Sequence, residues 1–308
     1  METSKYDLVI VGSGPIGAST AYFLADKKKK IAVVSPEPLA NDPDHIATYM
    51  YADGSVRWFF SDPDIVENTL KTAGFIHNQM DSGVDLSAIE DVYVFIQHGL
   101  AVPSLNVSGA KLVKHLLTEA QKMGVERLMN TRATGWEKDD ESYVLKTDRV
   151  DVRTDKILFV TGPSLQKFFP DAGFEFVKRQ TFVLDLPVTD ERKKFPHLIV
   201  PLKSGEVHIF IKQIGDQFKM LLGQEDLFRE GGEPGPEDHL KDLMEMGLGN
   251  TLEFLKEAHA ENILWGFDAP NKKLKLYRDG GIFAASCGSA VRSSIGLGQK
   301  LCDILLEG

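Results

Sequence analysis

The sequence predicts an α/β protein, α+β overall, in which a parallel-sheet domain is interleaved with a domain built on a mixed or antiparallel sheet. Three observations predict it. Residues 1–40 read as strand, glycine-rich turn, helix and strand; residues 182–222 hold successive strand-length runs; residues 280–306 give a last strand, turn and helix. The 308 residues are 43% hydrophobic and 26% charged, which allows a sizeable core divided between two domains.

The N-terminal unit begins with an apolar run at residues 8–11, typical of a buried parallel strand. The turn after it consists of Gly12, Ser13, Gly14, Pro15, Ile16 and Gly17. The first glycine permits a tight turn, the second lets the backbone approach a pyrophosphate, and the third lets the next helix pack against the strand. A helix expected over residues 18–28 offers its N-terminal amides to an anion, and a second strand follows at residues 31–34. This unit predicts a dinucleotide site, for either NAD or FAD.

The residue that ends the second strand departs from the dinucleotide-binding pattern. An Asp or Glu there would bond the adenosine ribose, but the chain has Ser35, followed by Pro36 and Glu37. Either Ser35 makes a neutral hydrogen bond to the ribose, or Glu37 reaches back after the proline turn. Because Ser35 is not a cation, nothing here supports a ribose 2′-phosphate.

The remaining elements follow from apolar spacing and capping residues. Asp62 is expected to cap a helix over residues 65–80, and Ser108 to cap one over residues 108–123. Strands are expected at residues 92–96, 129–136, 143–146, 156–161, 182–186, 198–201, 207–211 and 217–222. The last four favour a mainly antiparallel sheet. A loop over residues 229–237 and a helix reaching about residue 260 come next, and residues 295–298 are expected to open the terminal helix.

Charge, hydropathy and cysteine content exclude several classes of protein. The net charge of −10 disfavours nucleic acid and anionic membranes as partners. No apolar run reaches the roughly 20 residues of a membrane span, and no secretory segment precedes the first strand, so we expect a cytoplasmic protein. The eight histidines lack metal-ligand spacing, so no metal is expected. Cys287 and Cys302 are expected to be reduced thiols.

In this order, these pieces resemble the FAD-dependent D-amino acid oxidase superfamily, particularly its sarcosine and glycine oxidase-like branch. The resemblance covers nearly the whole chain and rests on the glycine turn, residues 105–109, the strand at Ala133, Thr161 with Gly162, and the terminal strand and turn. It implies a Rossmann-like FAD-binding domain formed by residues 1–45, 104–178 and 262–308. A substrate domain of residues 46–103 and 179–261 would cover the flavin.

The resemblance also implies positions for the cofactor contacts. The pyrophosphate would lie at Gly12, Gly14 and Gly17, the adenine at the backbone of Ala133, the cofactor channel at Thr161 and Gly162, and the isoalloxazine at Gly288 and Ser289. Some members of the family attach flavin covalently through His or Cys. His45 and Cys287 are therefore candidates, with a noncovalent or structural role as the favoured alternative.

Members of the family oxidise a carbon–nitrogen bond by hydride transfer to flavin, and Arg57 resembles the arginine that they place beside it. There it would bind a substrate carboxylate; the alternative is a surface arginine, which the neighbours Trp58 and Phe59 disfavour. In the sarcosine oxidase branch a second arginine follows three residues later. This chain has Phe60 there, and Arg292 is another candidate contact for an anion.

Lys219 resembles the lysine that these oxidases present above the flavin, where a cation assists the reaction with oxygen. Lys212, one strand earlier, is its rival. A lysine on an exposed strand face is the alternative for either residue.

The expected activity is oxidation of a small amine or amino acid, of sarcosine, glycine or D-amino acid type, to an imine, with oxygen or an electron carrier as acceptor. The nearest alternative is a flavin dehydrogenase that acts on a hydroxy acid or uses an acceptor other than oxygen. A non-catalytic flavin-binding interaction subunit is an alternative of another class, suggested by Phe60 and by the short chain. An NAD-dependent dehydrogenase is a third. A homo-oligomer is compatible with the sequence.

Overall fold

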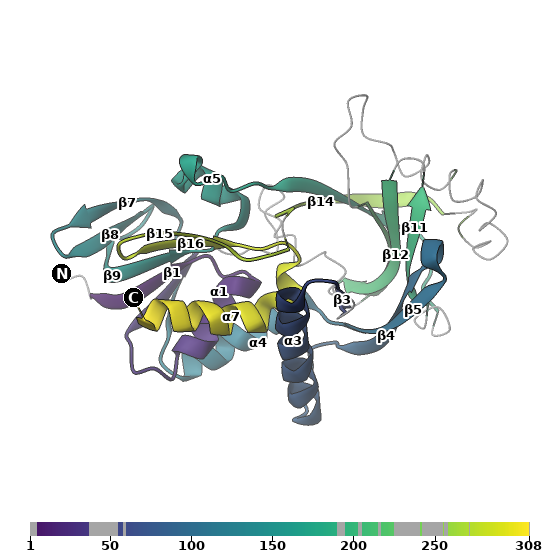
Figure 1. The fold of residues 1–308 in the computed structure, drawn as a ribbon, viewed down its shortest axis with the longest axis horizontal. Helices are drawn as coiled ribbons and strands as arrows, with labels where there is room; N and C mark the ends of the chain where they lie inside the picture. The colour runs from purple at the N-terminus through teal and green to yellow at the C-terminus, as the bar shows by residue number, and fades with distance from the viewer. Residues whose placement is uncertain are drawn as a thin grey trace.

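The computed structural model describes residues 5–36, 55–57, 60–189, 195–202, 205–214, 217–224, 241, 255, 258–270 and 272–307. Two eight-stranded sheets form two lobes (Figure 1). Helix α3 and the first turn of α7 lie where the lobes meet. The predicted α/β class, with a mixed second sheet, is confirmed. The domain boundaries at residues 45, 103, 178 and 261 stay a prediction.

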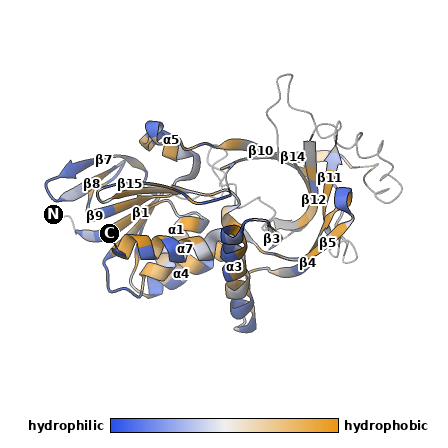
Figure 2. Ribbon diagram, viewed as in Figure 1, coloured by the Kyte–Doolittle hydropathy of each residue, from blue (hydrophilic) through white to orange (hydrophobic). Residues whose placement is uncertain are grey.

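The first sheet is parallel from its centre to one edge, and antiparallel pairs add the strands on its other side. Its main path runs β15 (Lys275–Asp279), β16 (Ile282–Ser286), β9 (Val152–Phe159), β1 (Tyr6–Val11), β2 (Ile31–Ser35) and β6 (Glu126–Met129); β8 (Ser142–Thr147) pairs with β9, and β7 (Ala133–Asp139) pairs with β8. Every residue of β2 and β16 is buried, as expected of strands covered on both faces. The edge strand β7, in contrast, is largely hydrophilic (Figure 2).

Three helices, α1 (Pro15–Leu24), α4 (Gly109–Lys122) and α7 (Ala290–Glu307), pack together beside the first sheet, and α3 (Pro63–Asp81) packs against α7. The two predicted caps are confirmed. The side chain of Asp62 accepts hydrogen bonds from the backbone of the first turn of α3, and that of Ser108 accepts one from Lys111 in α4. Among the described residues, no helix is both long and apolar enough to cross a bilayer.

The terminal helix corrects one prediction. It begins at Ala290, so Gly296 and Gly298 lie inside it and do not open it. A Cβ at Gly296 would overlap Asn68 of α3, and one at Gly298 would overlap Ser19 of α1. Glycine is required at these two positions because three helices pack closely there. A sequence pattern does not distinguish such a glycine from one in a turn.

Other boundaries also differ from the predictions. The single strand expected at residues 129–136 is two strands, β6 and β7, separated by Asn130, whose φ is +54°. Helix α1 starts three residues earlier than expected, because Pro15 is favoured in a first helical turn, and it ends at Leu24. The predicted loop at residues 229–237 lies outside the described residues. Ala260 begins a strand, although it was expected to end a helix.

The second sheet is antiparallel throughout except where β11 runs parallel to β4. Its order is β14 (Ala260–Asp268), β10 (Val177–Leu184), β13 (Gln217–Gln224), β12 (Gly205–Ile214), β11 (His197–Leu202), β4 (Ile89–Phe95), β5 (Leu100–Asn106) and β3 (Ser55–Val56). Four short helical segments complete the described chain: η1 (Ile96–His98), η2 (Gly162–Ser164), α5 (Leu165–Phe168) and η3 (Pro170–Ala172).

The two faces of the second sheet carry different side chains. One face bears the larger apolar cluster, which includes Phe182, Leu198, Ile209 and Met220. Because side chains alternate along a strand, the residues between these point the other way. We call that other side the inner face; it carries Val183, Phe210 and Leu221 and, by the same alternation, His197, His208 and Asp268.

Candidate functional site

The glycine turn between β1 and α1 has the geometry expected of a pyrophosphate site. Gly12 has φ +112°, and a Cβ there would lie 2.6 Å from the carbonyl oxygen of Val160. A Cβ at Gly17 would overlap the carbonyl of Gly12, so both positions require glycine. Gly14 is the N-cap of α1 and offers no side-chain cap, which leaves the first helical amides suited to an anion.

Ser35 ends β2 beside this turn. Its Oγ lies 2.8 Å from the Oγ of Ser13, and both side chains are buried. A hydroxyl donates once and accepts twice, so this bond leaves Ser35 able to contact a ribose as well. Glu37, the alternative ribose contact, lies outside the described residues.

Thr161 and Gly162 follow β9, the neighbour of β1. The hydroxyl oxygen of Thr161 is buried and has no hydrogen-bond partner among the described residues. Buried polar groups are nearly always satisfied, so this hydroxyl, next to the Gly12 turn, fits contact with a bound group. Gly162 has φ +57°, which glycine adopts without strain. Ala133 is the first residue of β7. Two residues before it, the backbone N–H of Thr131 donates to the carbonyl of Ser35.

Gly288 and Ser289 follow β16, the neighbour of β9 on the other side. Ser289 has φ +55°, and its N–H donates to the carboxylate of Asp268, with distances of 3.1 and 3.4 Å to the two oxygens. Helix α7 begins at the next residue, so a carboxylate from the second sheet lies at its N-terminus. The predicted cofactor residues of the four adjacent parallel strands β16, β9, β1 and β2 therefore lie at the carboxyl ends of those strands, the usual ligand edge of such sheets.

Cys287 precedes this turn and is a buried free thiol, as is Cys302. The Sγ of Cys287 donates to the carbonyl of Lys272 over 2.9 Å. Burial, with a smaller contribution from the charge of Asp268, raises the pKa of Cys287 to about 12. Because the thiolate is the nucleophile, this favours the structural alternative over covalent attachment to flavin. His45, the other covalent candidate, lies outside the described residues.

Arg57 follows β3 and is only 5% exposed, so the surface alternative is wrong. Its guanidinium carbon lies 5.6 Å from the ring centroids of both Phe60 and Phe95. Arg292, in the first turn of α7, is equally buried and lies 4.8 Å from the centroid of Phe60. Phe60 therefore holds two guanidinium groups together by cation–π contacts, at the position where the resemblance predicts a second arginine.

The pair His197 and His208 joins this group, and sequence reasoning did not identify it. The Nε2 of His197 lies 3.0 Å from the Nδ1 of His208, and the His197 ring stacks on Phe210 at 4.9 Å. Burial first, and then the charges of His208, Arg57 and Arg292, hold the pKa of His197 well below its ordinary value. Each histidine stands in an apolar strand run, but only the register of β11 on β12 brings the two together.

Lys219 forms an ion pair in the described part of the chain. Its Nζ lies 2.7 Å from the carboxylate of Glu261, at the edge of the second sheet. Lys212 is opposite Lys219 in the β12–β13 register, and the structure does not describe its side chain. A lysine above the flavin stays a prediction.

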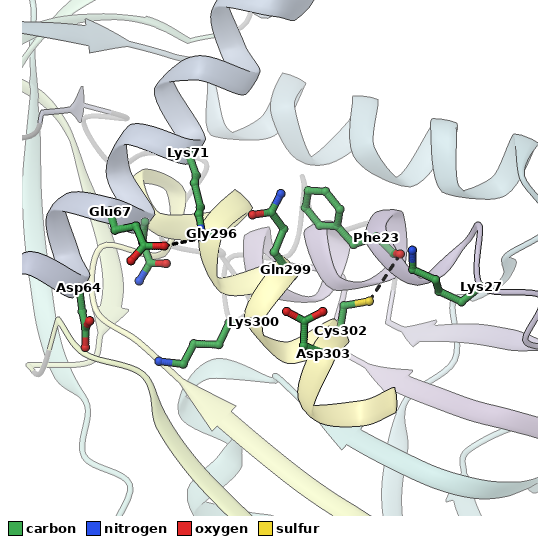
Figure 3. A pocket seen from close by; sticks show the side chains of 11 residues that line it. Phe23, Lys27, Asp64, Glu67, Lys71, Gly296, Gln299, Lys300, Cys302 and Asp303 are labelled. Atoms are coloured by element: carbon green, nitrogen blue, oxygen red, sulfur yellow. Dashed lines mark hydrogen bonds and ion pairs between the residues drawn. The ribbon is translucent and has the colours of Figure 1, made fainter. Parts of the chain in front are cut away.

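A cavity of about 510 Å³ lies between α1, α3 and α7, away from the strand ends (Figure 3). Its lining carries both signs of charge, with Lys71 and Glu67 forming an ion pair across one turn of α3. None of the residues predicted to bind cofactor or substrate lines it.

Comparison with known proteins gives a family and a fold. The sequence model of the DAO family, described as FAD dependent oxidoreductase, matches residues 44–304. No curated protein matches the chain.

The chain is similar to the solved structure of L-proline dehydrogenase from P. horikoshii, with 15% identity, a TM-score of 0.77, and coverage of 99% of this chain and 94% of that one. It is also similar to glycine oxidase from Bacillus cereus ATCC 14579, with 16% identity, a TM-score of 0.71 and coverage of 98% and 97%. It is similar as well to iminodiacetate oxidase from Chelativorans sp. BNC1, with 16% identity, a TM-score of 0.72, and coverage of 97% of this chain and 95% of that one. These likenesses establish a shared fold.

Proposed function

The chain belongs to the FAD dependent oxidoreductase family, and we propose that within it the protein oxidises the carbon–nitrogen bond of a small amino acid or amine to an imine. When bound, FAD supplies the two-electron acceptor for the hydride that leaves the substrate carbon. The imine then hydrolyses to a carbonyl compound. The protein contributes binding, orientation and exclusion of water.

One observation carries this proposal: Phe60 contacts both buried arginines, and one of them, Arg292, is three residues after Ser289, where the isoalloxazine is predicted. Buried guanidinium groups favour a planar carboxylate, which they can bind through two parallel hydrogen bonds. A substrate carboxylate held there would place its neighbouring carbon–nitrogen bond toward the predicted cofactor edge. The proline dehydrogenase and glycine oxidase that share the fold support an amino acid or amine as the substrate class.

For the cofactor, we propose that Gly12, Gly14 and Gly17 hold the pyrophosphate and that the buried hydroxyl of Thr161 forms a hydrogen bond with FAD. The steric need for glycine at two of these positions supports the first assignment. The hydroxyl of Thr161, which lacks a partner among the described residues, supports the second.

The ion pair between Lys219 and Glu261 favours a second candidate with the same chemistry, a dehydrogenase that passes electrons to a carrier. A lysine whose charge is compensated by a carboxylate is a weaker electrostatic aid to the reduction of oxygen than an uncompensated one. The two candidates differ only in the acceptor.

The test begins with the visible spectrum of the purified protein, which should show flavin bands. Small amino acids, amines and hydroxy acids are then added without oxygen, and bleaching of the flavin bands identifies the substrate class. Oxygen consumption with peroxide release indicates an oxidase, whereas turnover with an artificial acceptor alone indicates a dehydrogenase. Reduction by hydroxy acids but by no amine or amino acid would overturn the proposal.

A further inference from the structure

The His197–His208 pair lies on the inner face of the second sheet, beside the buried arginines. In the register of β12 on β13, His208 stands opposite Gly223, which contributes no side chain to this face. Thr181 and Phe210 are the nearest side chains to that position. On β14, the same face ends in Asp268, which bonds to the Ser289 turn. His208 therefore points from the sheet toward the side on which the predicted substrate and flavin lie.

Among the described residues, three basic groups act on the pKa of His197. His208, Arg57 and Arg292 each disfavour a proton on its ring. At neutral pH His197 is therefore a neutral ring with one N–H and one lone pair. Its hydrogen bond to His208 uses Nε2, so Nδ1 is the nitrogen that faces away from His208.

The neighbouring arginines favour one tautomer of His197. A guanidinium has donors only. Its positive charge therefore favours a lone pair, and not an N–H, on Nδ1 of His197. His197 then carries its proton on Nε2 and donates it to Nδ1 of His208. With Nδ1 accepting, the ring proton of His208 is on Nε2, which is a donor on that side.

We propose that Nε2–H of His208 donates a hydrogen bond to the substrate carboxylate, and that His197 is a positioning residue which fixes the tautomer and ring orientation of His208. This inference rests on the proposed function, since it assigns a contact within the same site. Together with Arg57 and Arg292, His208 gives three donor side chains, which match a carboxylate better than a neutral amide.

The test measures the binding of acetate and of acetamide, its uncharged analogue, to the FAD-loaded protein by calorimetry, independently of turnover. His208→Leu is expected to weaken acetate binding by about tenfold or more, the usual effect of losing one hydrogen bond to a charged group, with little change for acetamide. His208→Gln keeps an N–H donor and should retain most of the affinity. His77→Gln, on the exposed face of α3, is the matched control and should change nothing.

The role of His197 is tested by combining variants. His197→Phe alone should weaken acetate binding, because His208 then adopts either tautomer. In the His208→Gln background the same change should have no further effect, since glutamine has no tautomer to fix. If His197→Phe does not fold with bound FAD, His197→Gln replaces it and should retain the affinity, because it keeps a donor.

Two results separate this inference from the proposed function. Acetate binding that depends on His208, in a protein whose flavin no amine or amino acid reduces, would support the inference while the function fails. Turnover of amino acids with an unchanged acetate affinity in His208→Leu would leave the function standing and overturn the inference.

Discussion

At the scale of single residues, the buried hydroxyl of Thr161 differs from several other buried hydroxyls, which bond to protein atoms. Ser13 and Ser35 bond to each other, and Thr72 of α3 both donates to Asn68 and accepts from Ile295. Thr161 differs, because its buried hydroxyl has no partner among the described residues. A buried hydroxyl without a partner costs about 1–3 kcal/mol, which a ligand can recover on binding.

Thr161→Val should therefore have opposite effects in the two forms of the protein. In the flavin-free protein the melting temperature should stay constant or rise, whereas the affinity for FAD should fall several-fold. Thr72→Val, which removes a satisfied hydroxyl, should lower the melting temperature of both forms. Fluorescence titration with FAD and thermal unfolding measure these effects, and an unchanged FAD affinity in Thr161→Val would show that the cofactor does not use this hydroxyl.

His197 predicts a pH dependence of stability. Its folded pKa lies below the ordinary value of 6.5, so the unfolded chain binds a proton that the folded protein does not. The contribution of neutral His197 to the free energy of unfolding is then complete above pH 6.5 and is lost as the pH falls below that value. Denaturant unfolding between pH 7.5 and 5 should show a steeper loss for the wild type than for His197→Phe; parallel curves would mean that His197 is protonated in the folded state.

At the scale of secondary-structure elements, the sequence predicted the features that depend on residues close together in the chain. Asp62 and Ser108 cap their helices from the preceding residue, and the turn at Gly12 is fixed by the strand and helix on either side of it. The partner of His197 depends on the register of two strands, and the role of Gly298 depends on a helix from the start of the chain. Such contacts have no local signal, so the sequence did not pair the two histidines and wrongly placed Gly298 at the start of α7.

The glycines of α7 give a prediction at this scale. Gly298→Ala should lower the free energy of unfolding by about 1–3 kcal/mol, because its Cβ would overlap Ser19 of α1 and force the helices apart. Gly74→Ala, within α3 and with open space around it, should instead raise stability by up to about 1 kcal/mol through helix propensity. Chemical denaturation measures both, and the same sign of change for both variants would contradict the close helix contact.

At the scale of the whole molecule, residues far apart in the sequence build the site from two sheets. Arg57 comes from the second sheet and Arg292 from a helix beside the first, yet both contact Phe60. The carboxylate of Asp268, at the end of β14, bonds to the Ser289 turn across the same junction. The resemblance predicted that two domains enclose a flavin, but the contacts that join them follow from the fold as a whole.

Asp268 is the residue through which this junction can be tested. A carboxylate at a helix N-terminus stabilises it through the helix dipole, so Asp268→Asn should lower the free energy of unfolding by about 1 kcal/mol while preserving an acceptor oxygen for Ser289. Asp279 is an exposed carboxylate at the end of β15, and Asp279→Asn should change the free energy of unfolding by less than about 0.5 kcal/mol. Because the charge of Asp268 also contributes to the raised pKa of Cys287, the asparagine variant should let this thiol ionise at lower pH. Thiol titration in a Cys302→Ala background measures that shift, and an unchanged pKa of Cys287 would mean that the two sheets do not meet through this carboxylate.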